Sequence, residues 1–183
     1  YGDDPHLPKI EGKEGSPLSP YAVSKLAAEK YCQVFSRIYN LSTVCLRYFN
    51  VFGPRQDPFS PYAAVIPNFL MKILSGERPA IFGDGEQSRD FIYVLDVVEA
   101  NILASQADHI SGEVFNIARG AGTTINSLAT QIKEILGTSL VPSYEKPRPG
   151  DIRYSYADIS KAKKMLKYNP KFSLREGLEK TIR

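Results

Sequence analysis

A long helix that leads directly into a β-rich stretch constrains the fold of this chain more than any other feature of its sequence. Pro20 suits the first turn of a helix, where its missing N–H costs nothing, and Ser19 before it is a good N-cap. No further proline occurs before Pro54, and apolar residues recur at helical spacing, so we predict a helix over residues 20–39. Residues 42–49 are rich in β-formers and predict a buried strand.

Short helices and strands continue to alternate along the rest of the chain, which is typical of an α/β protein. We expect Asp96 and Asn126 to cap two of the helices, and the spacing of Ser173 and Glu176 predicts a capping box at the last one. The expected strands are 79–82, 89–94, 114–118 and 140–144, and the expected helices are 63–74, 96–107, 126–136, 159–166 and one from residue 173 onward.

The composition suits a globular protein with a sizeable core. The 183 residues are 43% hydrophobic and 23% charged, and the net charge of +3 gives no reason to expect a nucleic-acid partner. No apolar run of about 18 residues and no signal-peptide pattern occurs, so we expect a cytoplasmic protein without a membrane partner. Cys32 and Cys45 are expected to be reduced thiols. His6 and His109 lie far apart, and no metal-site spacing is present.

Tyr21 and Lys25 are the first candidates for chemistry. They stand four residues apart on the predicted helix, so they share one face roughly 6 Å apart. A nearby ammonium and the positive end of the helix dipole both favour the phenolate, which suits Tyr21 to accept a proton near neutral pH. By itself the pair fits an ordinary exposed tyrosine beside a solvated lysine better than it fits a catalytic pair.

Candidate binding residues stand at strand ends and in turns. Ligands of open parallel sheets lie beyond the carboxyl ends of the strands, which places Tyr48, Phe49 and Asn50 at a binding edge. Arginines in Gly-, Pro- and Asp-rich turns suit the two-pronged recognition of phosphate, although each could instead form a surface salt bridge. Asp151 could accept from ribose hydroxyls or cap a turn. The arginines are Arg55, Arg89 and Arg148.

Six stretches together resemble the extended short-chain dehydrogenase/reductase family and, within it, the UDP-glucose and UDP-N-acetylglucosamine 4-epimerases. They occur in the order of that family over nearly the whole chain, which makes the resemblance specific. The matching runs are residues 1–3, 19–25, 46–58, 62–67, 83–91 and 148–153.

The resemblance implies a Rossmann-type parallel sheet and a smaller mixed α/β domain for a sugar nucleotide. Residues 1–51 and 91–118 would form the later part of the Rossmann domain, and residues 52–90 and 119–183 the substrate domain. The match covers only the later part of a complete epimerase. The N-terminal glycine-rich NAD loop, the acid for the adenosine ribose and the Ser/Thr that shares the proton transfer are absent from this chain. We therefore expect residues 1–183 alone to bind NAD poorly and to be inactive.

The resemblance also implies a reaction, the NAD-dependent epimerisation of a UDP-hexose at C4 through a transient 4-keto sugar. Tyr21 would take the proton of the 4-hydroxyl while hydride moves to the nicotinamide. Lys25 would favour the phenolate of Tyr21 and bind the nicotinamide ribose, and Tyr48 and Val51 would flank the nicotinamide.

Further positions would hold the UDP-sugar. Ser155 stands where a large aromatic side chain restricts relatives to plain hexoses, and a small residue there implies room for an N-acetyl group. We therefore expect UDP-Glc and UDP-Gal, and also UDP-GlcNAc and UDP-GalNAc, as substrates. The diphosphate and ribose would be held by Asn50, Arg89, Arg148 and Asp151, and the uracil or sugar would be surrounded by Ala64, Val65 and Phe69.

Two other functions stay open. A sugar-nucleotide 4,6-dehydratase or a UDP-glucuronate epimerase/decarboxylase would share these motifs, but a dehydratase also needs an acid pair beside its Ser/Thr, in a segment that is absent here. A non-catalytic nucleotide-binding protein of the same fold commonly loses the tyrosine or the lysine, whereas Tyr21 and Lys25 are both present. The family is usually dimeric through the helix that carries the tyrosine, so we expect a homodimer.

Overall fold

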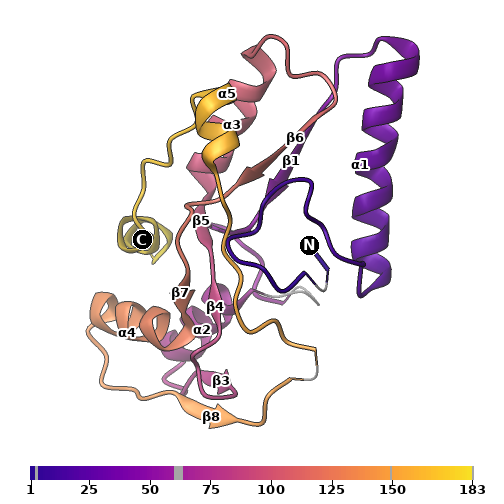
Figure 1. Ribbon diagram of the computed structural model, residues 1–183. Coiled ribbons are helices and arrows are strands. Elements are labelled where there is room, and N and C mark those ends of the chain that lie inside the picture. Colours follow the sequence, from indigo (N-terminus) through magenta and orange to yellow (C-terminus); the bar gives the residue numbers. More distant parts are fainter. Residues whose placement is uncertain (3, 60–63, 149, 183) are drawn as a thin grey trace.

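The computed structural model describes residues 1–2, 4–59, 64–148 and 150–182 (Figure 1). Residues 3, 62–63 and 149 of the family motifs lie outside this range, as does the expected helix start at residue 63. The helices are α1 (Pro20–Tyr39), α2 (Val65–Leu74), α3 (Val94–Gln106), α4 (Ile125–Leu136), α5 (Ser160–Leu166) and α6 (Leu174–Ile182). The strands are β1 (Val44–Tyr48), β2 (Asn50–Phe52), β3 (Ala80–Phe82), β4 (Ser88–Arg89), β5 (Phe91–Tyr93), β6 (Glu113–Ile117), β7 (Thr123–Thr124) and β8 (Ser143–Glu145).

Two parallel strand pairs follow one another at the centre of the fold. β1 pairs with β6, from Val44 opposite Glu113 to Tyr48 opposite Ile117. One residue later the chain continues as β2, which pairs in parallel with β5. Figure 1 shows α1 on one side of β1 and β6, and α3 with α5 on the other. Parallel pairs covered by helices on both sides confirm the expected α/β class.

The remaining strand pairs lie in the lower part of Figure 1, beside α2 and α4. β3 and β8 pair in parallel, and β4 and β7 pair antiparallel. This mixture of parallel and antiparallel pairing matches the mixed α/β unit that was expected beside the parallel sheet.

Buried side chains gather in two clusters. The first includes Phe52, Ile66, Phe69, Leu128 and Leu178. The second includes Val97, Phe115, Ile117, Ala162 and Tyr168. The second cluster therefore joins α5 to β6 and α3, although α5 lies in the range expected for the substrate domain. The division into residues 1–51 with 91–118 and residues 52–90 with 119–183 stays a prediction.

Local signals define α1 and α6 as the sequence predicts. Ser19 accepts a hydrogen bond from the amide of Ala22 (3.1 Å), and Pro20 stands in the first turn. At α6, the amide of Ser173 donates to the Glu176 carboxylate (2.8 Å), and the amide of Glu176 donates to the Ser173 hydroxyl (3.2 Å). This reciprocal pair confirms the capping box.

The expected cap at Asp96 is wrong. Tyr93 is the N-cap of α3, and Asp96 lies inside its first turn. The buried carboxylate of Asp96 instead accepts hydrogen bonds from the amides of Lys171 (2.8 Å) and Phe172 (3.3 Å). Two backbone amides of a distant segment thus donate to the carboxylate that the sequence pattern assigned to capping the helix.

The expected cap at Asn126 is wrong for a similar reason. Thr124 caps α4 by accepting from the amide of Ser127 (3.1 Å). The Asn126 side chain donates to the carbonyl of Asp84 (3.0 Å), in the turn between β3 and β4. Its amide group therefore holds this turn against α4 instead of starting the helix.

Three predicted strands are placed differently. The stretch 42–49 narrows to β1 and is followed by β2, while 89–94 divides into β4 and β5. The division arises because β4 pairs with β7 and β5 pairs with β2, so the chain changes partner at Asp90. The strand expected at 140–144 begins three residues later, as β8.

Candidate active site

Tyr21 and Lys25 lie together at the start of α1. The Tyr21 side chain is 63% exposed, and the Lys25 ammonium nitrogen lies 5.4 Å from the centroid of its ring. The shared helix face that the spacing predicts is therefore confirmed. An exposed phenol beside an ammonium is the arrangement that a proton-accepting tyrosine needs.

An ion pair holds this part of α1 against β1. Glu29 follows Lys25 by four residues, and its two carboxylate oxygens accept from Nε and Nη2 of Arg47, each at 2.8 Å. Arg47 also forms an ion pair with Glu14. Hydrogen bonds from the Gly12 amide and from Arg47 keep the pKa of Glu14 below its usual value, although burial acts in the opposite direction. The group thus joins the segment before α1, the helix itself and the strand after it.

Tyr1 extends this group toward β6. The Arg47 guanidinium lies 4.9 Å from the centroid of the Tyr1 ring, and the Tyr1 hydroxyl donates to the Asn116 side chain. Burial raises the pKa of Tyr1 to about 12. Tyr1 is therefore a neutral hydrogen-bond donor at neutral pH and serves to position its segment.

The candidate ligand-binding residues at the end of β1 and the start of β2 do not all lie on the side of β1 that faces α1. The Tyr48 hydroxyl donates to the side chain of Asn101 in α3 (2.9 Å), so Tyr48 lies on the opposite side of β1 from the contact between Arg47 and α1. Asn50 is exposed at the start of β2, and Val51 is partly buried. The structure thus does not bring the Tyr48 side chain to Tyr21.

The basic and acidic candidates in the later turns do come together. Arg89 Nη2 lies 2.5 Å from a carboxylate oxygen of Asp151, whose amide donates to the carbonyl of Arg148 (3.2 Å). The Arg148 guanidinium stacks 3.8 Å above the centroid of the Phe82 ring. Burial lowers the pKa of the Arg89 guanidinium, and Asp151 acts against this shift. Arg89 therefore pairs with a carboxylate, Arg148 lies on an aromatic face, and the backbone contact between Asp151 and Arg148 links the two pairs.

The candidate ligand-binding residues on and before α2 are less well placed to contact a ligand. Ala64 and Val65 are partly exposed at the start of the helix. Phe69 is only 3% exposed and lies within the first core cluster, so its side chain packs α2 against the core. Arg55 is exposed in the turn after β2.

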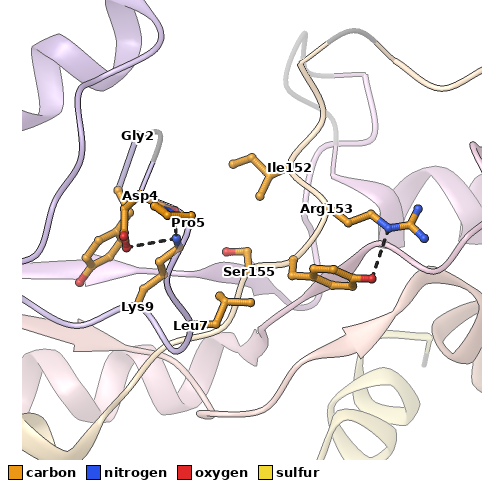
Figure 2. A pocket seen from close by; sticks show the side chains of 10 residues that line it. Gly2, Asp4, Pro5, Leu7, Lys9, Ile152, Arg153 and Ser155 are labelled. Atoms are coloured by element: carbon orange, nitrogen blue, oxygen red, sulfur yellow. Dashed lines mark hydrogen bonds and ion pairs between the residues drawn. The ribbon is translucent and has the colours of Figure 1, made fainter.

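A cleft of about 280 Å³ lies between the N-terminal segment and residues 152–155 (Figure 2). Figure 2 shows Lys9 on one side of the cleft, Ile152 and Ser155 on the other, and Leu7 just below Ser155. The amide of Ser155 donates to the carbonyl of Ser88 (3.1 Å), which fixes this wall to β4. The lining residues are Tyr1, Gly2, Asp4, Pro5, Leu7, Lys9, Ile152, Arg153, Tyr154 and Ser155. The small side chain of Ser155 leaves its part of the cleft open.

The sequence alone predicts no role in the site for three residues of this region: Glu29, Arg47 and Phe82. Glu29 continues the four-residue spacing of Tyr21 and Lys25, which is a usable signal. Phe82 ends a strand just before a glycine turn, a frequent position for ligand contacts in α/β proteins. Arg47 has no comparable local signal, because its partners Glu29 and Glu14 lie in other segments of the chain.

The described residues fit one end of a dinucleotide. The exposed hydroxyl of Tyr21 and the ammonium of Lys25 suit the ribose and nicotinamide of NAD. The chain has no glycine-rich motif for the pyrophosphate. Among the residues that the structure describes, no three His, Cys, Asp or Glu side chains are grouped to hold a metal ion, and no helix has the length and apolar character needed to cross a membrane.

Known proteins match this chain along its whole length. The model of the NAD dependent epimerase/dehydratase family matches residues 1–118. A putative UDP-glucose 4-epimerase of Methanocaldococcus jannaschii is 41% identical over 182 residues, which cover 100% of this chain and 58% of that protein. The chain therefore spans a little over half the length of this relative.

Two solved structures agree with the fold. A UDP-N-acetylglucosamine 4-epimerase from Methanobrevibacter ruminantium, in complex with UDP-N-acetylmuramic acid, superposes with a TM-score of 0.95 at 47% identity, over 100% of this chain and 58% of the other. A UDP-glucose 4-epimerase from Thermotoga maritima, solved with UDP-glucose, gives a TM-score of 0.87 at 48% identity, over 91% and 53% of the two chains.

Proposed function

Because this chain belongs to the NAD-dependent epimerase/dehydratase family, we propose that it carries the proton-transfer and sugar-nucleotide residues of a UDP-hexose 4-epimerase. The observation that carries the proposal is the exposed pair of Tyr21 and Lys25, 5.4 Å apart from ring centroid to ammonium nitrogen. The chain spans a little over half of its relatives, so the activity is proposed for the whole protein.

In this proposal Tyr21 accepts the proton of the sugar 4-hydroxyl and later returns it. Lys25 stabilises the phenolate of Tyr21 and binds a ribose of the cofactor. When bound, NAD supplies the hydride chemistry at C4. The Glu29–Arg47 ion pair keeps α1 in place on β1 and so fixes the position of Tyr21.

Arg89, Arg148 and Asp151 anchor the UDP group. A guanidinium forms paired hydrogen bonds with phosphate, and a carboxylate accepts from ribose hydroxyls. The contact of Arg89 with Asp151 and the stacking of Arg148 on Phe82 support this role, because the first holds Arg89 beside a carboxylate and the second holds Arg148 on an aromatic face. Firm binding of the UDP group leaves the hexose free to turn over between its two faces.

We propose that the substrates include N-acetylhexoses as well as plain hexoses. Ser155 lines the cleft with a small side chain, which leaves volume for an N-acetyl group. The similarity to a UDP-N-acetylglucosamine 4-epimerase and to a UDP-glucose 4-epimerase supports both substrate types.

Asn50, Val51, Ala64 and Val65 stay predicted ligand contacts. Tyr48 and Phe69 have less support than these, because one contacts α3 and the other lies in the core.

Two further parts of the proposal concern the whole protein. Residues 1–183 alone are expected to be inactive, since they hold no glycine-rich dinucleotide loop. A homodimer through α1 is supported by large apolar side chains that are exposed along this helix, namely Tyr31, Val34, Phe35, Ile38 and Tyr39. The cytoplasmic location stays a prediction from the sequence.

The test follows UDP-GlcNAc and UDP-Glc with NAD by proton NMR, using the protein as its source produces it. New anomeric signals of the C4 epimers are expected from the wild type and not from Tyr21→Phe. If neither sugar changes while UDP still binds, the proposed activity is wrong. A 4-keto-6-deoxy product would also overturn it, in favour of a dehydratase.

A further inference from the structure

Two cysteines lie where α1 packs against β1. Cys32 lies in α1 and Cys45 in β1, and both are partly buried free thiols. Contacts on either side of Cys45 fix this arrangement. The Thr43 hydroxyl donates to the carbonyl of Cys32 (2.9 Å), and Arg47 donates to Glu29 (2.8 Å). Because alternate residues of a strand point to the same face, Cys45 faces α1 together with Thr43 and Arg47.

The surroundings of Cys45 make its thiol less acidic than usual. Burial, followed by the influence of the Cys32 thiol and a hydrogen bond with it, raises the pKa of the Cys45 thiol to about 11. Cys45 is therefore a neutral thiol at neutral pH and a weak nucleophile. Cys32 is consequently the member of the pair that reacts first with an oxidant.

We propose that Cys32 and Cys45 form a reversible oxidation site, at which a small disulfide such as oxidised glutathione converts the two thiols into one disulfide bond between α1 and β1. The proposal does not depend on the proposed enzymatic function. It adds an oxidised state to the reduced thiols that the sequence predicts.

The reaction consists of two thiol–disulfide exchanges. Cys32, as a thiolate, attacks one sulfur of the small disulfide, and the other half leaves and takes up a proton as a free thiol. Cys45 then loses its proton to water and attacks the Cys32 sulfur, which releases the second small thiol. The protein gives up two electrons and two protons, and the small disulfide gains both.

The bond would connect the helix that carries Tyr21 and Lys25 to the strand that follows it in the chain. It closes a short loop and so restricts the unfolded chain, which favours the folded state. We expect the oxidised protein to melt at a higher temperature than the reduced protein.

The experiment exposes the protein, as its source produces it, to oxidised glutathione and then blocks remaining thiols with an alkylating agent. Intact-mass measurement of the wild type should show the loss of two hydrogens and no lasting glutathione adduct. Peptide mapping should find Cys32 joined to Cys45, and dithiothreitol should restore both thiols. A glutathione adduct that persists on the wild type, or two thiols that stay unreacted, would overturn the proposal.

Two matched variants test the order of the steps. Cys45→Ser should accumulate a stable glutathione adduct on Cys32, because the second exchange is blocked. Cys32→Ser should form its adduct on Cys45 at least about ten-fold more slowly, since the remaining thiol is neutral. Equal rates would contradict the assignment of Cys32 as the first nucleophile. The wild-type result alone decides the proposal if a variant fails to fold.

Discussion

Arg47 of β1 and Glu29 of α1 form a two-pronged ion pair, with Nε and Nη2 each 2.8 Å from a carboxylate oxygen. The Arg47 side chain is 18% exposed and that of Glu29 is 9% exposed, so the pair is largely removed from water. It connects the helix that carries Tyr21 and Lys25 to the strand that ends beside the candidate site. The position of the proposed proton acceptor therefore depends on a contact that lies two turns further along its helix.

Removal of Arg47 should destabilise the protein strongly. Arg47→Met leaves the carboxylates of Glu29 and Glu14 close together without their cation, and breaking a buried pair in this way costs about 3 kcal/mol or more. Lys72→Met is the control, because the ion pair of Lys72 with Glu77 is exposed and should contribute less than about 1 kcal/mol. Urea unfolding measures both values. Similar losses in the two variants would contradict this view of the Arg47 pair.

Asp90 should be similarly important for stability. Its fully buried carboxylate accepts hydrogen bonds from four backbone amides, those of Arg119, Gly120, Ala121 and Ala157. Asp90→Ala leaves these donors without their acceptor, and we expect a loss of about 3 kcal/mol or more. Asp57→Ala, which removes an exposed acceptor of one amide, should cost less than about 1 kcal/mol.

Hydrogen exchange provides a local readout of the same prediction. The amides of Gly120 and Ala157 should exchange faster in Asp90→Ala than in the wild type, and they should be unchanged in Asp57→Ala. Unchanged protection in Asp90→Ala would show that these amides find other acceptors.

The ion pair of Asp84 with Arg153 should make stability depend on pH. Hydrogen bonds from Arg153 lower the pKa of Asp84 from 3.8 to about 2. Since the folded pKa is the lower one, the stabilisation is present above about pH 4 and is lost as the pH falls toward about 2. Asp84→Asn should therefore be less stable than the wild type at pH 6, and the difference should shrink below pH 4.

The control for this pH dependence is to make Asp84→Asn in a protein that already carries Arg153→Met. Without the guanidinium, the difference between Asp84 and Asp84→Asn should depend on pH much less, and what remains comes from the hydrogen bond that the Glu86 amide donates to Asp84 (2.9 Å). A pH-dependent difference that keeps its full wild-type size in this background would assign the effect to a group other than Arg153.

Ser155 should determine whether N-acetylhexoses enter the cleft. Ser155→Tyr fills the space that we assign to the N-acetyl group, so kcat/KM for UDP-GlcNAc should fall by at least about 100-fold. The value for UDP-Glc should stay within about three-fold of the wild type, and Ser155→Ala should preserve both. Unchanged selectivity in Ser155→Tyr would remove Ser155 from the sugar site.

The parts of the fold that local sequence signals determine could be predicted. Ser19 and Pro20 define the start of α1, and the apolar spacing that follows extends it to Tyr39. The misassigned caps, Asp96 and Asn126, are polar residues near a helix start that found better partners elsewhere. Those partners come from distant segments, and a sequence pattern contains no information about their approach.

In the candidate site, too, contacts within one helix could be predicted from the sequence, whereas contacts between distant segments could not. The helical period alone brings Lys25 beside Tyr21. By contrast, the contact of Arg89 with Asp151 and the stacking of Arg148 on Phe82 join turns that are far apart in the sequence. The motifs predict that Arg89, Arg148 and Asp151 bind a ligand, and only the folded chain shows that Arg89 lies beside Asp151 and Arg148 beside Phe82.

The most direct test of the proposed chemistry follows a UDP-hexose that carries deuterium at C4, with NAD and the protein as its source produces it. We predict a C4 epimer that keeps its deuterium, because the same hydrogen leaves and returns while Tyr21 handles only the hydroxyl proton. We also predict that Tyr21→Phe slows this conversion by at least about 100-fold. An epimer with solvent hydrogen at C4, or a Tyr21→Phe variant as fast as the wild type, would contradict the proposed chemistry.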